Sequence, residues 1–330
     1  MITSPPVVVD ADVLLRNVDY AVRKGYSGAL ISTASSEYST STGVMLFASA
    51  EAAMEVKRHL PDIAQRRKVA QETVEQVWAE TFARIVRVIS VPDGVIDDPR
   101  IEGTDPKDRH TARLACLLAP VVLATDNRKD FKPFDLPTTK TDTVAIDLAK
   151  VGRFTTGTQA AATVPVGLGA LTISGSKKVA ETIGRNQALL LGVLLLGIAI
   201  LYFKSERSSA LRSKLEHVAD EMGPKLVEFI DEANAASDRI DAFAIDRAVP
   251  PDAVSLLARH LAISAPTMTT VEIADWLTEH RLSFKGPGEH RKLTRSWLTR
   301  TPCFEERARG RWALGHYENL PDLTKPNSTA

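Results

Sequence analysis

Acidic side chains follow two β-branched runs of the chain, at the point where each run ends. The run VVV at 7–9 leads into Asp10, and Asp12 stands two residues further on. The run VVLAT at 121–125 leads directly into Asp126. Short β-branched runs bounded by polar residues are typical of buried strands, and ligands of parallel sheets bind at the carboxyl ends of the strands. We therefore expect these carboxylates to gather at one edge of a sheet.

A further acid, Asp108, stands in TDPKDRHTARLA, just before a helical pattern that begins near Arg109. Aspartate is also a common helix N-cap, and capping is the ordinary interpretation of Asp108 taken by itself. Several carboxylates in one place repel each other unless a cation neutralises them. Ligation by oxygen alone is typical of Mg²⁺ or Mn²⁺, and the chain has no cluster of His and Cys suited to zinc. The acids therefore indicate a site for a hard divalent cation.

The elements that must position these acids alternate between strands and helices. Amphipathic patterns cover Ala48–His59, Gln71–Val86 and Asp108–Leu118, between the two strand-like runs. Strands that alternate with helices form a parallel sheet with helices on both faces. The sequence therefore predicts the α/β class for the first 150 residues.

The length and composition indicate an ordinary globular protein of several parts. A chain of 330 residues exceeds one core and predicts two or three units of roughly 100–150 residues. The 41 basic and 41 acidic residues cancel, so net charge indicates no partner. Cys116 and Cys303 have no disulfide or metal-ligand spacing and fit a reducing compartment. No signal peptide is visible at the N-terminus, which predicts that the first acids are cytosolic.

In their order, these pieces resemble PIN-domain nucleases, and among them the toxin ribonucleases of bacterial toxin–antitoxin pairs. The resemblance covers about residues 5–150. In that family the first strand ends in an Asp followed by aliphatic residues, as Asp10 does in VVVDADVLL. A second acid, usually Glu, lies on a helix, and Glu55 in LFASAEAAMEVKRHL fits it best. Glu51, one helical turn away, is the alternative.

The two remaining family motifs lie later in the chain. The third family acid opens an Ala-rich helix and corresponds to Asp108, with Asp105 as the nearby alternative. The last motif is a strand that ends in Thr, then Asn or Asp, then an acid before Phe. It falls on Thr125, Asn127, Asp130 and Phe131. Asp126 is an extra acid here, so either Asp126 or Asp130 completes the metal site.

The resemblance implies metal-dependent hydrolysis of phosphodiester bonds by an endoribonuclease that acts on single-stranded or structured RNA. It assigns the catalytic and metal-binding roles, with Mg²⁺ or Mn²⁺ as cofactor, to Asp10, Glu55, Asp108 and Asp130, with Asp126 as a further metal ligand. Supporting roles fall to Thr125, Asn127 and Asp12. His110, beside Asp108, is interpreted as a helix-surface histidine rather than a general acid. The implied partners are an RNA substrate and a cognate inhibitor protein.

A membrane segment is predicted in the middle of the chain. The eighteen residues from Asn186 to Phe203 carry no charge, and a helix of this length spans about 27 Å of a bilayer core of about 30 Å. Lys204 and Arg207 follow at once, as at a membrane boundary. We therefore expect a transmembrane helix at 186–203, contact with membrane lipid, and a membrane-associated protein whose nuclease domain is cytoplasmic. A helix buried in protein is the alternative.

The segments around this run have less definite patterns. Residues 151–185 are a linker or a weak first membrane segment, because Thr155–Ser176 is uncharged but contains Pro and several Gly. A single span would place the two ends of the chain on opposite sides of a membrane, whereas two spans would bring both back to the cytosol. Residues 204–249 form a charged helical linker whose apolar spacing suits a coiled coil, and hence a homodimer. The tail at 319–330 has a disordered composition.

The last domain, at 250–318, has three amphipathic patterns at 253–264, 270–281 and 289–300. Two strand-like runs follow on either side of Arg309-Gly310, and Thr269 or Thr270 suits the N-cap of the second helix. Three helices and a hairpin resemble a winged helix-turn-helix. Between Arg281 and Trp312 there are nine Lys or Arg and three Glu. This excess predicts contacts with DNA or RNA through Arg291, Lys292, Arg295, Arg300, Arg307, Arg309 and Arg311, and a protein-binding role is the alternative.

Two functions from different classes fit these patterns. The first is a membrane-associated ribonuclease, toxin-like or defence-related, whose winged helix recruits nucleic acid. The second is a non-catalytic, membrane-tethered adaptor, in which a PIN-like fold binds nucleic acid or a protein without cutting. Acids at every family position favour the ribonuclease.

Overall fold

The computed structural model describes residues 6–25, 45–83, 85–136, 144–148, 150–151, 228, 231–246, 252–282 and 290–315. The predicted membrane helix at 186–203 and the tail at 319–330 lie outside these residues, as does most of the segments 151–185 and 204–249. Within the described ranges, no helix combines the length and apolar character needed to cross a membrane.

A five-stranded sheet forms the centre of the α/β part, and the predicted α/β class is confirmed. Its order is β3-β2-β1-β4-β5. The first four strands pair in parallel; they are β1 (Val7–Val9), β2 (Leu46–Ser49), β3 (Val86–Ile89) and β4 (Val121–Ala124). The edge strand β5 (Ala244–Ile245) is antiparallel to β4 and comes from the segment predicted as a helical linker. The sheet is therefore mixed.

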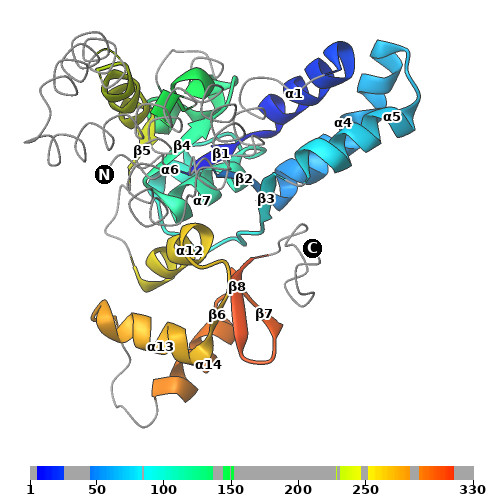
Figure 1. The fold of residues 1–330 in the computed structure, drawn as a ribbon. Coiled ribbons are helices and arrows are strands. Elements are labelled where there is room, and N and C mark those ends of the chain that lie inside the picture. Colours follow the sequence, from blue (N-terminus) through cyan, green and yellow to red (C-terminus); the bar gives the residue numbers. More distant parts are fainter. Residues whose placement is uncertain are drawn as a thin grey trace, which may run out of the picture. The chain divides into compact units, whose positions relative to one another are not determined.

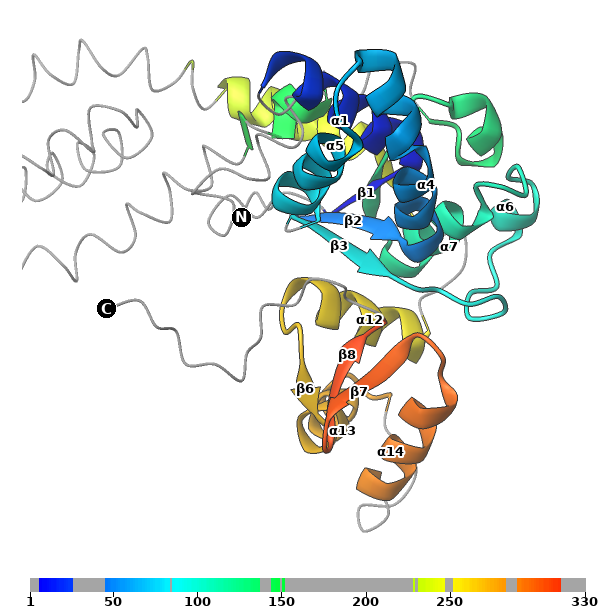
Figure 2. The same cartoon turned by 90° about the vertical axis from the view of Figure 1, so that its right-hand side faces the viewer.

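Helices lie on both faces of this sheet (Figures 1 and 2). On one face are α1 (Ala11–Lys24), α4 (Ala50–Arg67) and α5 (Gln71–Val77), which continues as the π-helix η1 (Trp78–Phe82). After β3, the chain forms α6 (Pro99–Glu102) and α7 (Arg109–Leu118), then crosses to β4 on the far side of β1. Right-handed crossovers in opposite directions place their helices on opposite faces, which accounts for the position of α7.

Two predicted helix boundaries are wrong because the apolar runs beside them are short strands. The pattern placed at Ala48–His59 begins two residues later, since Ala48 and Ser49 end β2 and the Ser49 hydroxyl caps α4. The pattern placed at Gln71–Val86 ends at Phe82, and Val86 begins β3. Four-residue buried strands have no visible alternation, so their sequence merges with the neighbouring helix pattern.

The described residues after 252 confirm the three helices and the hairpin. They form α12 (Ala253–Ile263), β6 (Met268–Thr269), α13 (Thr270–Glu279), α14 (His290–Arg300), β7 (Phe304–Ala308) and β8 (Arg311–Leu314). The strand β6 adds a third member to the hairpin, in the order β6-β8-β7. Of the two predicted N-cap candidates for α13, Thr269 is the cap, and it forms a capping box with Glu272.

The C-terminal elements pack against the α/β part, and the two share one hydrophobic core. Helix α12 lies against α7, and Leu257 and Leu261 join Leu114 and Leu117 in one buried cluster. Gly315 follows β8 at a φ of +53°, and a Cβ atom there would lie 2.9 Å from Ile89 at the end of β3. A side chain at this position would push the two parts away from each other.

The described residues around 144–151 and 231–242 belong to a second compact unit. In this unit Arg239 donates two hydrogen bonds, of 2.6 and 2.8 Å, to the buried carboxylate of Asp147. This pairing neutralises a charge that would otherwise be costly to bury.

Candidate functional site

The strand order changes direction at β1, whose neighbours are β2 on one side and β4 on the other. At such a point the loops after two adjacent strands leave in opposite directions and open a crevice. Asp10 follows β1 and Thr125 follows β4, and the Asp10 amide donates to the Ala124 carbonyl at 3.0 Å. The two predicted site residues are therefore neighbours at the switch point.

The Asp10 carboxylate is buried, with 3% of the residue exposed. Its Oδ1 accepts hydrogen bonds from the Ala11 amide (2.9 Å) and the Thr111 hydroxyl (3.2 Å), and its Oδ2 accepts from the Thr125 hydroxyl (3.1 Å). Burial, together with the nearby charge of Asp12, raises the pKa of Asp10 to about 7. The hydrogen bonds fix the orientation of the carboxylate but do not outweigh its desolvation.

Asp108 occupies the N-cap position of α7, yet its side chain makes no capping hydrogen bond. Its pKa is raised to about 7, first by burial and then by the charges of four other carboxylates. We call these five side chains the acidic cluster: Asp108, Asp10, Asp130, Asp105 and Glu55. The Asp108 side chain therefore does not cap α7. It lies instead among like charges, most of which come from separate segments of the chain.

Asp130 and Asp126 face different neighbours. Asp130 lies on the 3₁₀-helix η2 (Arg128–Phe134), accepts a hydrogen bond from the Asn127 amide group and acts electrostatically on Asp108. Asp126 instead forms an ion pair with Arg16, and its backbone amide donates to Asp12 at 2.9 Å. Burial raises the pKa of Asp12 to about 6. The geometry thus places Asp130 in the acidic cluster and Asp126 beside Asp12.

Glu55 and Glu51 lie one turn apart on α4. Glu55 acts on Asp108 and also borders a groove of about 620 Å³ between α1 and α4, together with Asp12. Glu51 Oε2 is buried with no hydrogen-bond partner in the described part of the chain. A buried carboxylate oxygen without a partner indicates room for a cation or a water molecule.

His110 has surroundings that the sequence interpretation missed. It is not a surface histidine, since its ring lies partly buried between Ser49 at the end of β2 and Thr111. Burial lowers the pKa of His110, while the charges of Glu51 and Glu55 act in the opposite direction. Nothing local to RHTARL signals this, because Ser49 lies 61 residues away in sequence.

The donor chemistry of the acidic cluster fits a hard divalent cation. All of its ligand atoms are carboxylate oxygens, and a cation would offset the burial and the neighbouring negative charges that raise the pKa values of Asp10 and Asp108. Among the described residues, however, no three His, Cys, Asp or Glu side chains lie close enough together to hold one ion.

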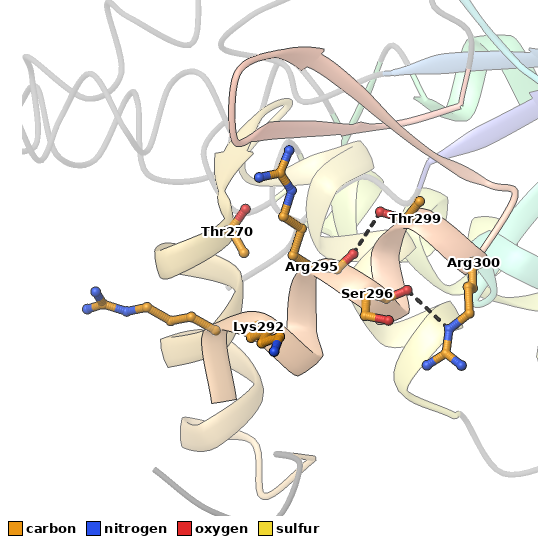
Figure 3. A pocket seen from close by; sticks show the side chains of 7 residues that line it. Thr270, Lys292, Arg295, Ser296, Thr299 and Arg300 are labelled. Atoms are coloured by element: carbon orange, nitrogen blue, oxygen red, sulfur yellow. Dashed lines mark hydrogen bonds between the residues drawn. The ribbon is translucent and has the colours of Figure 1, made fainter. Parts of the chain in front are cut away.

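A second candidate surface lies on α14, where a groove of about 540 Å³ is lined by cations and hydroxyl groups. Its lining residues are Thr270, Arg291, Lys292, Arg295, Ser296, Thr299 and Arg300. Figure 3 shows Lys292, Arg295 and Arg300 projecting from the helix. Arg295 also forms an ion pair with Glu306, at 3.2 Å. The lining has no acidic residue, so it suits a phosphate-bearing ligand.

The three predicted arginines of the β7–β8 hairpin lie outside this groove. Arg307 donates to the Gly315 carbonyl at 2.9 Å and pairs with Glu305, so it holds the end of the hairpin. Arg311 donates to the Thr267 hydroxyl at 3.0 Å. Arg309 is exposed at the hairpin turn. The groove thus contains four of the seven predicted basic residues.

Comparison of this chain with protein-family models, curated proteins and solved structures finds no match.

Proposed function

We propose that this protein is a divalent-metal-dependent nuclease of the PIN type, and specifically an endoribonuclease. The observation that supports this proposal is the acidic cluster. Burial, and then the charges of Asp10 after β1, Asp130 on η2 and Glu55 on α4, raise the pKa of Asp108 at the start of α7. Carboxylates with strongly raised pKa values that gather in one place are typical of functional sites.

The chain's own residues would prepare this site for a phosphodiester. Thr111 and Thr125 hold the two oxygens of Asp10, and Asn127 orients Asp130. The N-terminus of α7 carries a partial positive charge beside Asp108, which favours an anionic group there. When bound, Mg²⁺ or Mn²⁺ supplies Lewis-acid stabilisation of the charge that develops on the phosphate.

The test is Mn²⁺-dependent cleavage of single-stranded RNA by the purified full chain. The Asp10→Asn variant keeps the shape of the side chain and should lose cleavage by at least about 100-fold, since it removes a charge essential to metal catalysis. The matched control is Asp97→Asn, because Asp97 is an exposed acid of the same part of the chain. Cleavage by wild type that is unchanged in Asp10→Asn, or absence of cleavage by wild type, would overturn the proposal.

The α14 groove favours nucleic-acid binding as a second component of this function. Its four cations and three hydroxyl groups match the donors that contact phosphates in protein–nucleic acid complexes. A winged-helix domain that binds RNA or DNA would hold the nucleic acid on the same molecule as the acidic cluster. If binding persists without any cleavage, the non-catalytic adaptor is the better description. Membrane association and the cytoplasmic position of the nuclease part remain predictions from the sequence.

A further inference from the structure

A network of hydrogen-bonding side chains connects the ends of β1 and β2 through the first turn of α7. His110 Nδ1 lies 2.8 Å from the Ser49 hydroxyl oxygen and 3.1 Å from the Thr111 hydroxyl oxygen. The Thr111 hydroxyl in turn donates to Asp10 Oδ1 at 3.2 Å. Ser49 ends β2 and Asp10 follows β1, so the imidazole bridges two neighbouring strands.

The two hydroxyl groups that contact His110 are shielded from water, while the His110 ring itself is partly buried. Ser49 and Thr111 are both 0% exposed. The Ser49 hydroxyl also accepts from the Ala52 amide at 3.1 Å, which fixes it at the N-terminus of α4. A hydrogen bond in such surroundings is stronger than one in water, and an unpaired hydroxyl there is costly. The partners of His110 are therefore held in place on both sides.

The Thr111 hydroxyl has one proton, and it is donated to Asp10. His110 Nδ1–H must then be the donor, shared between the Thr111 and Ser49 oxygens, and its contact with the Thr111 oxygen favours the hydroxyl rotation that donates to Asp10. Loss of the Nδ1 contact would leave Thr111 free to turn away from Asp10. In metal sites, the groups that orient the ligands are in general nearly as important as the ligands.

We propose that His110 is a positioning residue of the nuclease site, which acts through Nδ1 on Thr111 and thereby on Asp10. This inference rests on the proposed function. It assigns His110 no contact with substrate and no proton transfer, although Glu51 and Glu55 of α4 also lie near its ring.

Isosteric substitutions separate the two ring nitrogens. The Asn side chain places its amide group where Nδ1 lies, whereas the longer Gln side chain places its amide group where Nε2 lies. We therefore compare His110→Asn, His110→Gln and His110→Ala in the full chain, with RNA cleavage in Mn²⁺ and the Mn²⁺ dissociation constant as readouts. We expect His110→Asn to stay close to wild type, while His110→Gln and His110→Ala lose about 10-fold or more in kcat with KM little changed.

Equal loss in His110→Asn and His110→Gln would overturn the proposal, because an amide at the Nδ1 position would then fail to replace the ring. Loss in His110→Asn with retention in His110→Gln would also overturn it, because it would give the function to Nε2. Wild-type activity in all three variants would also overturn it. Absence of cleavage by wild type would contradict the proposed nuclease activity. The hydrogen-bond network from His110 to Asp10 could then still be tested through the stability of the fold. In that case, a double-mutant cycle of His110→Gln and Thr111→Val by denaturant unfolding should show coupling, and additive losses would overturn the bridge.

Discussion

The Arg259 guanidinium of α12 donates hydrogen bonds to the backbone carbonyls of Leu118, the last residue of α7, and of Pro120. In the reverse direction, Arg87 of β3 donates to the Ala262 carbonyl near the end of α12 at 2.6 Å. Cations at helix C-termini stabilise carbonyl groups that have no partner within the helix. Each part thus supplies a donor to the C-terminal end of a helix in the other part. Helix α7 has this contact at its C-terminal end and Asp108 at its N-terminal end.

Substitution Arg259→Ala should lower the free energy of unfolding by roughly 1.5–3 kcal/mol, the range for hydrogen bonds that involve a charged group. The reason is that the Leu118 and Pro120 carbonyls lose their donor at a contact that is partly buried at Leu118 and exposed at Pro120. Urea unfolding of the full chain measures the effect. The exposed Arg58→Ala variant on α4 is the matched control and should change stability little. Equal stabilities of the two variants would contradict the role assigned to Arg259.

The contribution of the acidic cluster to the free energy of unfolding should fall as the pH rises from about 4 to 8 in the absence of divalent cations. Asp10 and Asp108 have pKa values raised from 3.8 to about 7, so the fold favours their protonated forms. This contribution is complete below the ordinary pKa and is lost as the pH rises through the raised one. Unfolding experiments between pH 4 and 8.5 should show the slope, and an Asp10→Asn, Asp108→Asn double variant should flatten it.

Addition of Mn²⁺ should reverse this loss at pH 8, because a bound cation replaces the protons that relieve the repulsion. The measurement is the shift of the unfolding midpoint with and without Mn²⁺ at pH 5.5 and pH 8. A larger stabilisation at pH 5.5 than at pH 8 would be inconsistent with binding at these carboxylates.

Substitutions on α14 should weaken nucleic-acid binding in a salt-dependent manner. Arg291→Gln and Arg300→Gln each remove a cation of the groove, so each should reduce the slope of log affinity against log salt by about 0.7–0.9. Arg307→Gln is the matched control, because Arg307 holds the end of the hairpin and lies outside the groove. Fluorescence anisotropy with labelled RNA and DNA measures the slopes. A slope reduced by Arg307→Gln alone would place the contact on the hairpin instead.

The shared core requires that the α/β part and the C-terminal part lie on the same side of any membrane. Cysteines introduced at the exposed positions Glu75 and Asp275 should therefore react from the same side with a membrane-impermeant maleimide, in membrane vesicles or in a soluble fraction. Cys116 and Cys303 are buried and should react slowly. Labelling of the two positions from opposite faces of vesicles would contradict the packing of α12 on α7.

The sequence determined the features that depend on interactions between residues close together in the chain. β1 and β4 are short apolar runs rich in Val, α13 begins with its own capping box, and Asp10 and Thr125 directly follow β1 and β4. Periodicity, capping and the direction of side chains at strand ends depend on a few neighbouring residues, so they can be predicted from those residues.

Tertiary structure decided which residues meet across long separations. The sequence left Asp126 and Asp130 as alternatives, and the Arg16 ion pair turns Asp126 toward α1 while Asp130 faces Asp108. His110 has an ordinary helical context and gains its partner only from β2. Likewise, the apolar face of α12 fits either an independent domain or a contact with α7. Burial of a face depends on which surfaces the whole chain brings together, and no local pattern contains that information.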